Sequence, residues 1–229
     1  MTMLIDSMVE RAKADKKTIV LPEGHDDRIL AAAEETLKQG IANLVILGDA
    51  EEINAKGYNL EGAEIINPAT SDKVDEFASL LFELRKKKGM TEEEARELVT
   101  KDNIYFATMM VKTGQCDGLV GGASCATVKI LSPALKVLKT APGAPMVSSL
   151  FLMEVPNCDL GENGVFAFAD CALEIQPTAE KLAHIANLTN QSFKRLLGKE
   201  ARIALLSHSS HGSAKNDDAQ KVVDAMTYI

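Results

Sequence analysis

Residues 118–129 combine glycines, hydroxyl side chains and a lysine at the point where an apolar run meets an expected helix. This segment reads GLVGGASCATVK and contains Gly122, Ser124, Thr127 and Lys129. Small residues let backbone N–H groups approach an anion closely, and a helix N-terminus adds roughly half a positive charge. The segment therefore predicts a phosphate-binding loop in which the two hydroxyls donate and the lysine supplies countercharge. The alternative is a tight turn in which Ser124 or Thr127 only caps the helix.

Residues 205–215 repeat this order of apolar run, small polar loop and helix start. The segment reads LLSHSSHGSAK, and its candidate contacts for an anionic or polar ligand are Ser207, Ser209, Ser213 and Lys215. The alternative is a solvated loop with a serine cap. No metal site is expected here, because the two histidines of the loop have no further ligand nearby.

Arg85 and Cys171 are the remaining candidates. Arg85 lies in a basic run, LRKKKG, which is typical of a solvated helix end where cations favour the C-terminal dipole. If it turns inward, its guanidinium suits a bidentate phosphate or carbonyl clamp instead. Cys171 follows an expected strand and could line a site, although such a cysteine is more often a small buried hydrophobe. Because no base is adjacent in sequence, covalent catalysis by this thiol is not expected.

Alternating strands and helices must position these residues. The apolar runs that predict strands lie at residues 18–21, 44–47, 63–66, 118–121, 146–153, 165–169 and 203–206. The patterns that predict helices lie near residues 29–37, 72–87, 91 onward, 103–112, 127–139, 178–197 and 217 onward. Thr91 with Glu94 predicts a capping box, and Gly40 and Gly198 predict helix ends. The alternation implies an α/β fold of parallel βαβ units with helices on both sheet faces, and residues 141–145 are its one plausible seam.

The composition excludes several classes of protein. With 229 residues, 46% hydrophobic and 25% charged, the chain is an ordinary globular one. Its net charge of −8 argues against a nucleic-acid partner, and no apolar run approaches the roughly 20 residues of a transmembrane helix. Asp6 and Glu10 stand where a signal peptide is apolar, and the four cysteines lack metal-ligand spacing. We therefore expect a cytoplasmic protein with free thiols and no membrane partner.

Six stretches, in one order from about residue 18 to the end of the chain, together resemble the phosphate acetyl/butyryltransferase family. They read IVLPEGHDDRIL, ELRKKKGMTEEEA, NIYFATMMVKTGQCDGLVGGA, PALKVLKTAPGAPMVSSLFLM, FADCALEIQPTAEKLAHIA and ALLSHSSHGSA. The resemblance implies two three-layer αβα domains with mostly parallel sheets and a cleft between them, as in isocitrate and isopropylmalate dehydrogenases. The domains would span residues 1–144 and 145–229. It also implies a homodimer.

The activity implied by this resemblance is reversible transfer of an acetyl group between acetyl-CoA and phosphate, giving acetyl phosphate and CoA. Coenzyme A would be a substrate, with no permanently bound cofactor and no metal. Its thiol, with an unperturbed pKa of about 8.5, must lose a proton before the sulfur attacks the acyl phosphate in a ternary complex. Donors must also stabilise the oxyanion and the leaving phosphate. By resemblance, Arg85 and Cys171 fall at substrate-site positions, and the loops at 121–127 and 207–213 border the cleft.

Three departures from the family pattern bear on this expectation. Ser132 stands where the family has an arginine before the proline, which would weaken phosphate binding unless Lys129 or Lys136 compensates. Cys125 stands where the family usually has histidine or another polar residue. The sequence stops at Ile229, whereas family members continue for roughly a hundred residues, about a small domain's worth of chain. We therefore expect an incomplete second domain and a first domain without its C-terminal return segment. The base that the resemblance implies for the CoA thiol cannot be assigned to a residue here, so we expect little acetyl transfer.

Three other functions remain open. A phosphate butyryltransferase or other acyl-phosphate transferase would share these motifs, although the stretch PALKVLKTAPG favours the acetyl branch. A non-catalytic fragment would bind CoA or acyl phosphate without turnover. A dehydrogenase of the same architecture would need aspartates that hold a divalent metal, and no equivalent pattern is present.

Overall fold

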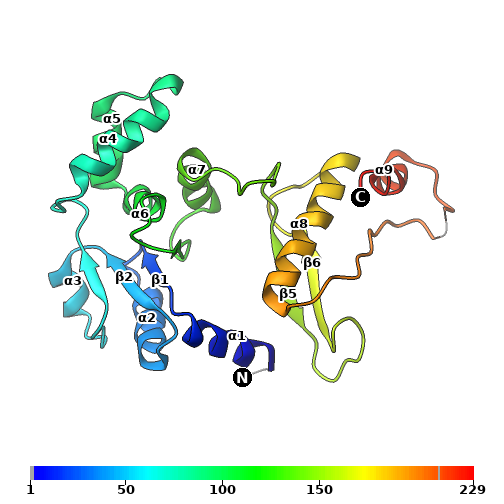
Figure 1. Ribbon diagram of the computed structural model, residues 1–229, viewed down its shortest axis with the longest axis horizontal. Coiled ribbons are helices and arrows are strands. Elements are labelled where there is room, and N and C mark those ends of the chain that lie inside the picture. Colours follow the sequence, from blue (N-terminus) through cyan, green and yellow to red (C-terminus); the bar gives the residue numbers. More distant parts are fainter. Residues whose placement is uncertain (1–2, 211) are drawn as a thin grey trace. The chain divides into compact units, whose positions relative to one another are not determined.

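The computed structural model describes residues 3–210 and 212–229 and forms two compact units (Figure 1). Unit 1 is Met1–Lys139 and unit 2 is Thr140–Ile229. The division falls just before residues 141–145, the segment that the sequence indicates as the seam. That the two units are the family's two domains, bounded at 144 and 145, stays a prediction.

Unit 1 is built on a four-stranded parallel sheet with the order β3-β2-β1-β4. The strands are β1 (Thr18–Leu21), β2 (Asn43–Leu47), β3 (Glu64–Ile66) and β4 (Gly118–Leu119). Leucine and β-branched side chains dominate β1 and β2, as expected for parallel strands that are covered on both faces. Val20 of β1 is in register with Val45 of β2 and Leu119 of β4. The order places β1 next to β4, its neighbour in space but not in sequence.

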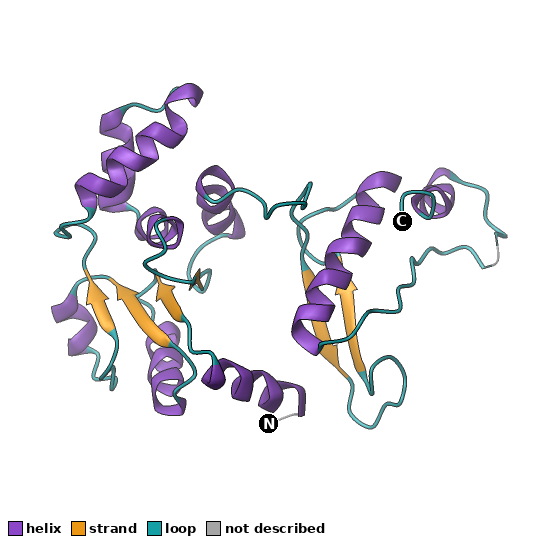
Figure 2. Cartoon of the chain, viewed as in Figure 1, coloured by secondary structure: helices purple, strands orange, loops and turns teal. Residues whose placement is uncertain are grey.

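Helices cover both faces of this sheet, so the predicted α/β class with three-layer architecture is confirmed (Figure 2). The helices of unit 1 are α1 (Met3–Ala14), α2 (Asp27–Gln39), α3 (Ala50–Ala55), α4 (Val74–Arg85), the 3-10 helix η1 (Lys86–Lys88), α5 (Glu92–Lys101), α6 (Asn103–Lys112) and α7 (Thr127–Val137). One core cluster joins strand residues to α2 and α3 through Leu30 and Ile53. The other joins the opposite strand face to α4, α5 and α6 through Phe77, Val99 and Phe106.

The helix ends follow local signals in the sequence. Thr91 and Glu94 form the predicted capping box at the start of α5. Gly40 ends α2 with a left-handed φ of 68°, as glycine permits. The short α3 was not predicted from the pattern, and Asp49 caps it. Among the described helices, none combines the length and apolar character needed to span a membrane.

Unit 2 contains an antiparallel pair, β5 (Leu150–Glu154) and β6 (Val165–Ala169), with Leu152 opposite Ala167. Its helices are α8 (Ala179–Leu197), which packs on β6, and α9 (Asp217–Ala225), which packs on α8. The hairpin explains the proline- and glycine-containing loop at 155–164 between the two strands. The parallel sheet expected for the fold is therefore the sheet of unit 1.

The predicted strand at residues 203–206 is wrong. The segment has no regular structure, and Ile203 and Leu206 are 45% and 78% exposed. A strand exists only through hydrogen bonds to a neighbouring strand, and the described part of unit 2 offers none for these residues. Two other predicted strands are shorter in the structure. β5 begins at Leu150 rather than at 146, and β4 ends at Leu119 rather than at 121.

The Phe77→Ala substitution tests the core of unit 1. The rings of Phe77 and Phe106 are fully buried and meet edge to face with centroids 5.0 Å apart. Removing one ring is expected to lower the free energy of unfolding by about 3–5 kcal/mol, measured by urea unfolding with circular dichroism. Phe151→Ala, at a ring that is 57% exposed, is the matched control and is expected to cost less than about 1 kcal/mol. Equal losses for the two variants would contradict this account of the core.

Candidate functional site

The carboxyl ends of β1 and β4 lie side by side at one edge of the sheet, which is where ligands bind in open α/β folds. From β1 the chain continues through Pro22, Glu23 and Gly24. A Cβ atom on Gly24 would lie 2.6 Å from the carbonyl oxygen of Leu47, so the backbone can pass this point only as glycine. From β4 the chain continues into the segment at 121–127.

The carboxylate of Glu23 lies at the centre of this edge. One oxygen, Oε2, accepts hydrogen bonds from the backbone N–H groups of Gly122 (2.7 Å) and Ala123 (2.9 Å). The other, Oε1, accepts from the backbone N–H and the hydroxyl of Ser124, both at 2.8 Å. We call these three backbone N–H groups the amide nest. The loop thus has the anion-binding geometry expected from its sequence, but its occupant is a side chain of the same protein.

Hydrogen bonding keeps Glu23 ionised despite its burial. The side chain is 3% exposed, and burial by itself raises the pKa of a carboxyl group. The donors of Ser124, Ala123 and Gly122 outweigh this effect and lower the pKa of Glu23 to about 2. A full negative charge is therefore present inside the nest at neutral pH.

Side chains from α2 and its preceding loop hold the same turn from outside. His25 Nε2 lies 3.1 Å from the Ser124 hydroxyl oxygen. Arg28 donates from Nη2 to the carbonyl oxygen of Ala123 at 2.5 Å, and its guanidinium also pairs with Asp26 at 2.6 Å. The backbone N–H groups of the 122–124 turn are thus bonded to Glu23, and the carbonyl of Ala123 accepts from Arg28.

The start of α7 differs from the capping alternative. Ala126 is the N-cap residue and makes no side-chain cap, so neither Ser124 nor Thr127 has that role. Thr127 and Lys129 lie exposed in the first turn of α7. Burial and the charge of Glu23 raise the pKa of the Cys125 thiol. Cys125 is therefore a neutral thiol at neutral pH, which does not suit a nucleophile.

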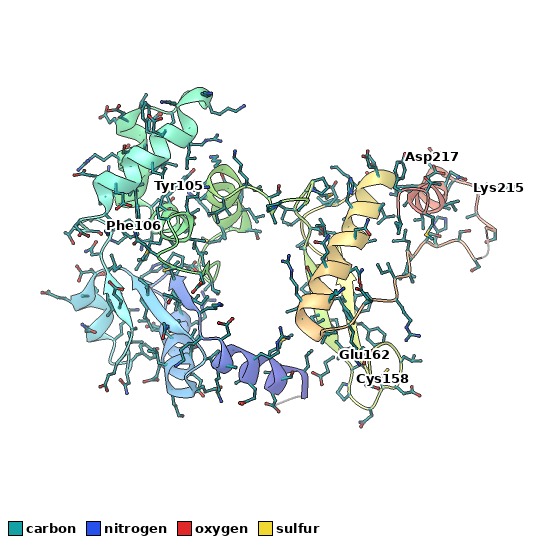
Figure 3. The ribbon with its side chains drawn as sticks, in the orientation of Figure 1. Tyr105, Phe106, Cys158, Glu162, Lys215 and Asp217 are labelled. Carbon is teal, nitrogen blue, oxygen red and sulfur yellow. The ribbon has the colours of Figure 1, made fainter. Side chains whose placement is uncertain are left out.

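Arg85 lines a cavity of about 670 Å³ between α4, α5, α6 and α7. Lys88, Lys101 and Lys136 also line it, and Lys136 Nζ donates to the hydroxyl of Tyr105 at 3.4 Å (Tyr105 is labelled in Figure 3). Lys101 pairs with Glu97, whereas Arg85, Lys88 and Lys136 make no ion pair with any described carboxylate. The acidic residues on its wall are Glu94, Glu97 and Asp102. Three of the four cations that line the cavity therefore have no carboxylate partner among the described residues.

The cavity and the amide nest are separate features of unit 1. None of residues 122–129 lines the cavity around Arg85. Ser132 lies on α7 four residues before Lys136, and therefore on the same helix face as that cavity-lining lysine. The arginine that the family pattern places at 132 would therefore extend from this face.

In unit 2, Asp170 organises the loop that contains Cys171. Its carboxylate accepts from the backbone N–H groups of Ala172 (2.9 Å) and Leu173 (2.8 Å), and from the backbone N–H (2.8 Å) and hydroxyl (2.6 Å) of Ser149. Burial opposes ionisation, but these bonds hold the pKa of Asp170 well below its usual range. The backbone N–H of Cys171 donates to the Ser149 hydroxyl at 3.3 Å. Cys171 is thereby held directly after β6.

The second polar loop bonds mainly to itself. The hydroxyl of Ser207 accepts from the backbone N–H of Ser209, and the hydroxyl of Ser209 accepts from the backbone N–H of Ala214, both at 3.1 Å. Asn216 rather than a serine caps α9, and Ser213 and Lys215 are exposed beside it (Lys215 is labelled in Figure 3). His211 lies outside the described residues. The grouping of this loop with Arg85 and the 121–127 loop around one cleft stays a prediction.

Sequence reasoning missed Glu23, which organises the 121–127 loop, and Asp170, which organises the loop with Cys171. Each follows a predicted strand, which is the signal that could have identified them. The partner of Glu23 could not be read from the sequence, since β1 and β4 become neighbours only in the folded sheet. Within the described residues, no group of three His, Cys, Asp or Glu side chains is placed to hold a metal ion.

The fold and site define a class of protein. They are those of α/β proteins that bind ligands at the carboxyl ends of the strands of a parallel sheet. The family model described as phosphate acetyl/butaryl transferase matches residues 3–229. The chain belongs to this family, which confirms the resemblance drawn from its motifs. Its relatives are acyltransferases.

The most similar relatives support this assignment. The phosphate acetyltransferase of Thermoanaerobacterium thermosaccharolyticum is 55% identical over 96% of this chain and 67% of its own length. That of Acetivibrio thermocellus is 48% identical over 96% and 67%. A solved phosphotransacetylase from Streptococcus pyogenes is 35% identical, with a TM-score of 0.89 over 100% of this chain and 69% of its own. The EutD phosphotransacetylase from Staphylococcus aureus is 34% identical, with a TM-score of 0.85 over 98% and 66%. The chain thus spans about two thirds of these proteins.

Acidification tests the charge of Glu23. Because its pKa falls from 4.5 in the unfolded chain to about 2 in the folded one, its stabilising effect is complete above pH 4.5 and is lost as the pH falls toward 2. The expected loss is about 3 kcal/mol, measured by urea unfolding at a series of pH values. Glu23→Gln is expected to remove this part of the pH dependence.

Glu34→Gln is the matched control, because the Glu34 carboxylate accepts one backbone hydrogen bond, from Asn59, whereas Glu23 accepts three from backbone N–H groups and one from a hydroxyl. This variant is expected to keep the acid-dependent loss. If the free energy of unfolding of Glu23→Gln fell as much between pH 4.5 and 2 as that of the unsubstituted protein, the ionised Glu23 carboxylate would not be the cause of the loss.

Proposed function

We propose that this protein takes part in reversible acetyl transfer between CoA and phosphate, with acetyl phosphate as the second acetyl carrier. The observation that carries the proposal is the cavity of unit 1, where Arg85, Lys88 and Lys136 face one space without carboxylate partners among the described residues. The high identity to phosphate acetyltransferases across nearly the whole chain supports it. Both CoA and acetyl phosphate are anions that such cations bind.

In this proposal the sulfur of CoA forms a bond to the acetyl carbonyl carbon of acetyl phosphate. The bond from that carbon to the bridging oxygen then breaks, and inorganic phosphate leaves with the electron pair. A base must first take the thiol proton, and we assign this role to none of the residues described. Arg85 and Lys136 would hold the phosphate groups, which lowers the cost of the negative charge on the leaving oxygen.

Other candidates take supporting roles in the proposal. Thr127 and Lys129 stand exposed at the start of α7, where a helix N-terminus favours anions. Cys171 and the loop with Ser207, Ser209, Ser213 and Lys215 would contribute from unit 2. We further propose a cytoplasmic homodimer, which rests on the family resemblance and on the use of CoA. Acetyl is preferred over butyryl as the acyl group, and the test is a comparison of rates with acetyl- and butyryl-CoA.

The Arg85→Ala substitution tests the cavity. Losing a charge-assisted hydrogen bond costs about 1.5–3 kcal/mol, so the affinity for CoA is expected to fall about ten- to hundredfold. Isothermal titration calorimetry with CoA measures it, and a thioester assay with CoA and acetyl phosphate reports turnover in the same samples. Lys112→Ala, at an exposed lysine in the last turn of α6, is the control and is expected to bind CoA normally.

The calorimetry and the assay separate the alternatives. Binding of CoA without thioester formation would favour the non-catalytic fragment over an active transferase. Absence of any CoA binding by the unsubstituted protein would refute the proposal.

Ser132→Arg tests the departure from the family pattern. The new guanidinium would extend from the same face of α7 as Lys136 and add a bidentate donor for phosphate. The affinity for acetyl phosphate is expected to rise by about tenfold, measured by calorimetry. Ser132→Gln, which adds length without charge, is the control and should leave the affinity unchanged. An unchanged affinity in the arginine variant would show that position 132 does not face the substrate, and a weaker one would contradict the expected gain.

A further inference from the structure

The amide nest has no free donor for an outside anion. A carboxylate offers about four acceptor positions on its two oxygens. Glu23 uses them on four donors, which are the backbone N–H groups of Gly122, Ala123 and Ser124 and the Ser124 hydroxyl, all within 2.9 Å. Glu23 is 3% exposed and already accepts from all four donors, so an outside anion could bind them only by displacing its carboxylate.

We propose that Glu23 is a positioning residue that acts as a built-in anion for the 121–127 loop. Its carboxylate takes the place in the nest that an anionic substrate group would otherwise take. The loop therefore presents Thr127 and Lys129 from a fixed turn, and its own amides do not bind substrate. The hydrogen bonds by themselves show that Glu23 occupies the nest. The role of the loop toward substrate rests on the proposed function.

The backbone around the nest is shaped for this contact. Gly122 has a φ of 106°, a conformation that side-chain-bearing residues rarely adopt. A Cβ atom on Gly121 would lie 3.0 Å from Cγ of Pro22, so the absence of a side chain lets the two strand ends approach. Asn103 of α6 donates to the carbonyl oxygen of Pro22, the residue before Glu23, at 3.0 Å.

Charged and titratable groups surround the carboxylate on several elements. Arg28 of α2 binds Ala123 through its guanidinium and interacts favourably with the charge of Glu23. His25 contacts the Ser124 hydroxyl, and Cys125 lies next in the loop with its thiol pKa raised. Asp26 is neutralised by Arg28. Because Arg28 is paired with Asp26, the charge of Glu23 is stabilised mainly by the N–H and O–H dipoles of the 122–124 turn.

Unit 2 contains the same device at a different strand end. The carboxylate of Asp170 also takes four donors, which are the backbone N–H groups of Ser149, Ala172 and Leu173 and the hydroxyl of Ser149. In both cases a carboxylate next to a strand end pairs with consecutive backbone amides and one serine hydroxyl. This recurrence supports a positioning role for internal carboxylates at the strand-end loops of this chain.

The test is chemical rescue of the Glu23→Ala variant of the full chain. Without the carboxylate, hydrogen exchange at the amides of 122–124 is expected to be at least tenfold faster than in the unsubstituted protein. Formate, a carboxylate small enough for the vacated space, is expected to restore slow exchange and to raise the melting temperature of the variant. Inorganic phosphate is the second probe. Neither ion is expected to change exchange at these amides in the unsubstituted protein.

The Glu34→Ala variant is the matched control, since it also removes a hydrogen-bonded glutamate, and it should show no rescue by formate. If Glu23→Ala fails to fold, Glu23→Gln serves instead, because its amide keeps one acceptor but turns an NH2 group toward the nest. Exchange at 122–124 should then also be at least tenfold faster, and it should be unchanged at the amides of 172–173.

Two results would overturn the inference. One is exchange at 122–124 that is unaffected by loss of the Glu23 carboxylate. The other is a change in the hydrogen exchange of these amides when phosphate is added to the unsubstituted protein, since the nest would then be open to an outside anion. None of these measurements uses turnover or CoA. If CoA fails to bind while formate rescue is seen, the proposed function fails and the built-in anion stands.

Discussion

The pairing of the Glu23 carboxylate with three consecutive backbone amides is the interaction on which the edge of unit 1 depends. It joins positions 99 to 101 residues apart and connects the ends of β1 and β4. Burying the charge is costly, and four donors at hydrogen-bond distance repay that cost. The donors belong to a turn that contains Gly121 and Gly122, and the carboxylate bonds to three consecutive amides of that turn. The turn leads directly into α7, whose first turn contains Thr127 and Lys129.

The cavity of unit 1 has four basic and three acidic residues in its lining, although the chain as a whole is acidic. The chain carries a net charge of −8, yet Arg85, Lys88 and Lys136 gather around one cavity of unit 1. Binding of a small anion depends on the few groups within a Debye length of roughly 10 Å, so the acidic surface elsewhere has little effect on it. Overall charge is thus informative about nucleic acids, but it does not exclude phosphate-bearing substrates.

Two of the four thiols, those of Cys116 and Cys125, are poor nucleophiles in this structure. Burial raises the pKa of Cys116 to about 11, and burial together with Glu23 raises that of Cys125. A thiol in either position stays protonated at neutral pH. The chemistry proposed for the family needs no protein thiolate, since the attacking sulfur belongs to CoA. Burial is the main cause of the raised pKa of Cys125, and the Glu23 carboxylate adds to it.

The sequence by itself determined the α/β class, the helix caps at Thr91 and Gly40, most strands, and the family, because these depend on local periodicity and on contiguous motifs. It also indicated the anion-binding shape of the 121–127 loop. Tertiary structure decided what fills that loop, since Glu23 meets Gly122 only when β1 and β4 pair. It likewise decided that 203–206 is no strand, because pairing requires a neighbour, and that Arg85 and Lys136 line one cavity. Contacts between distant segments follow from packing, which no local pattern encodes.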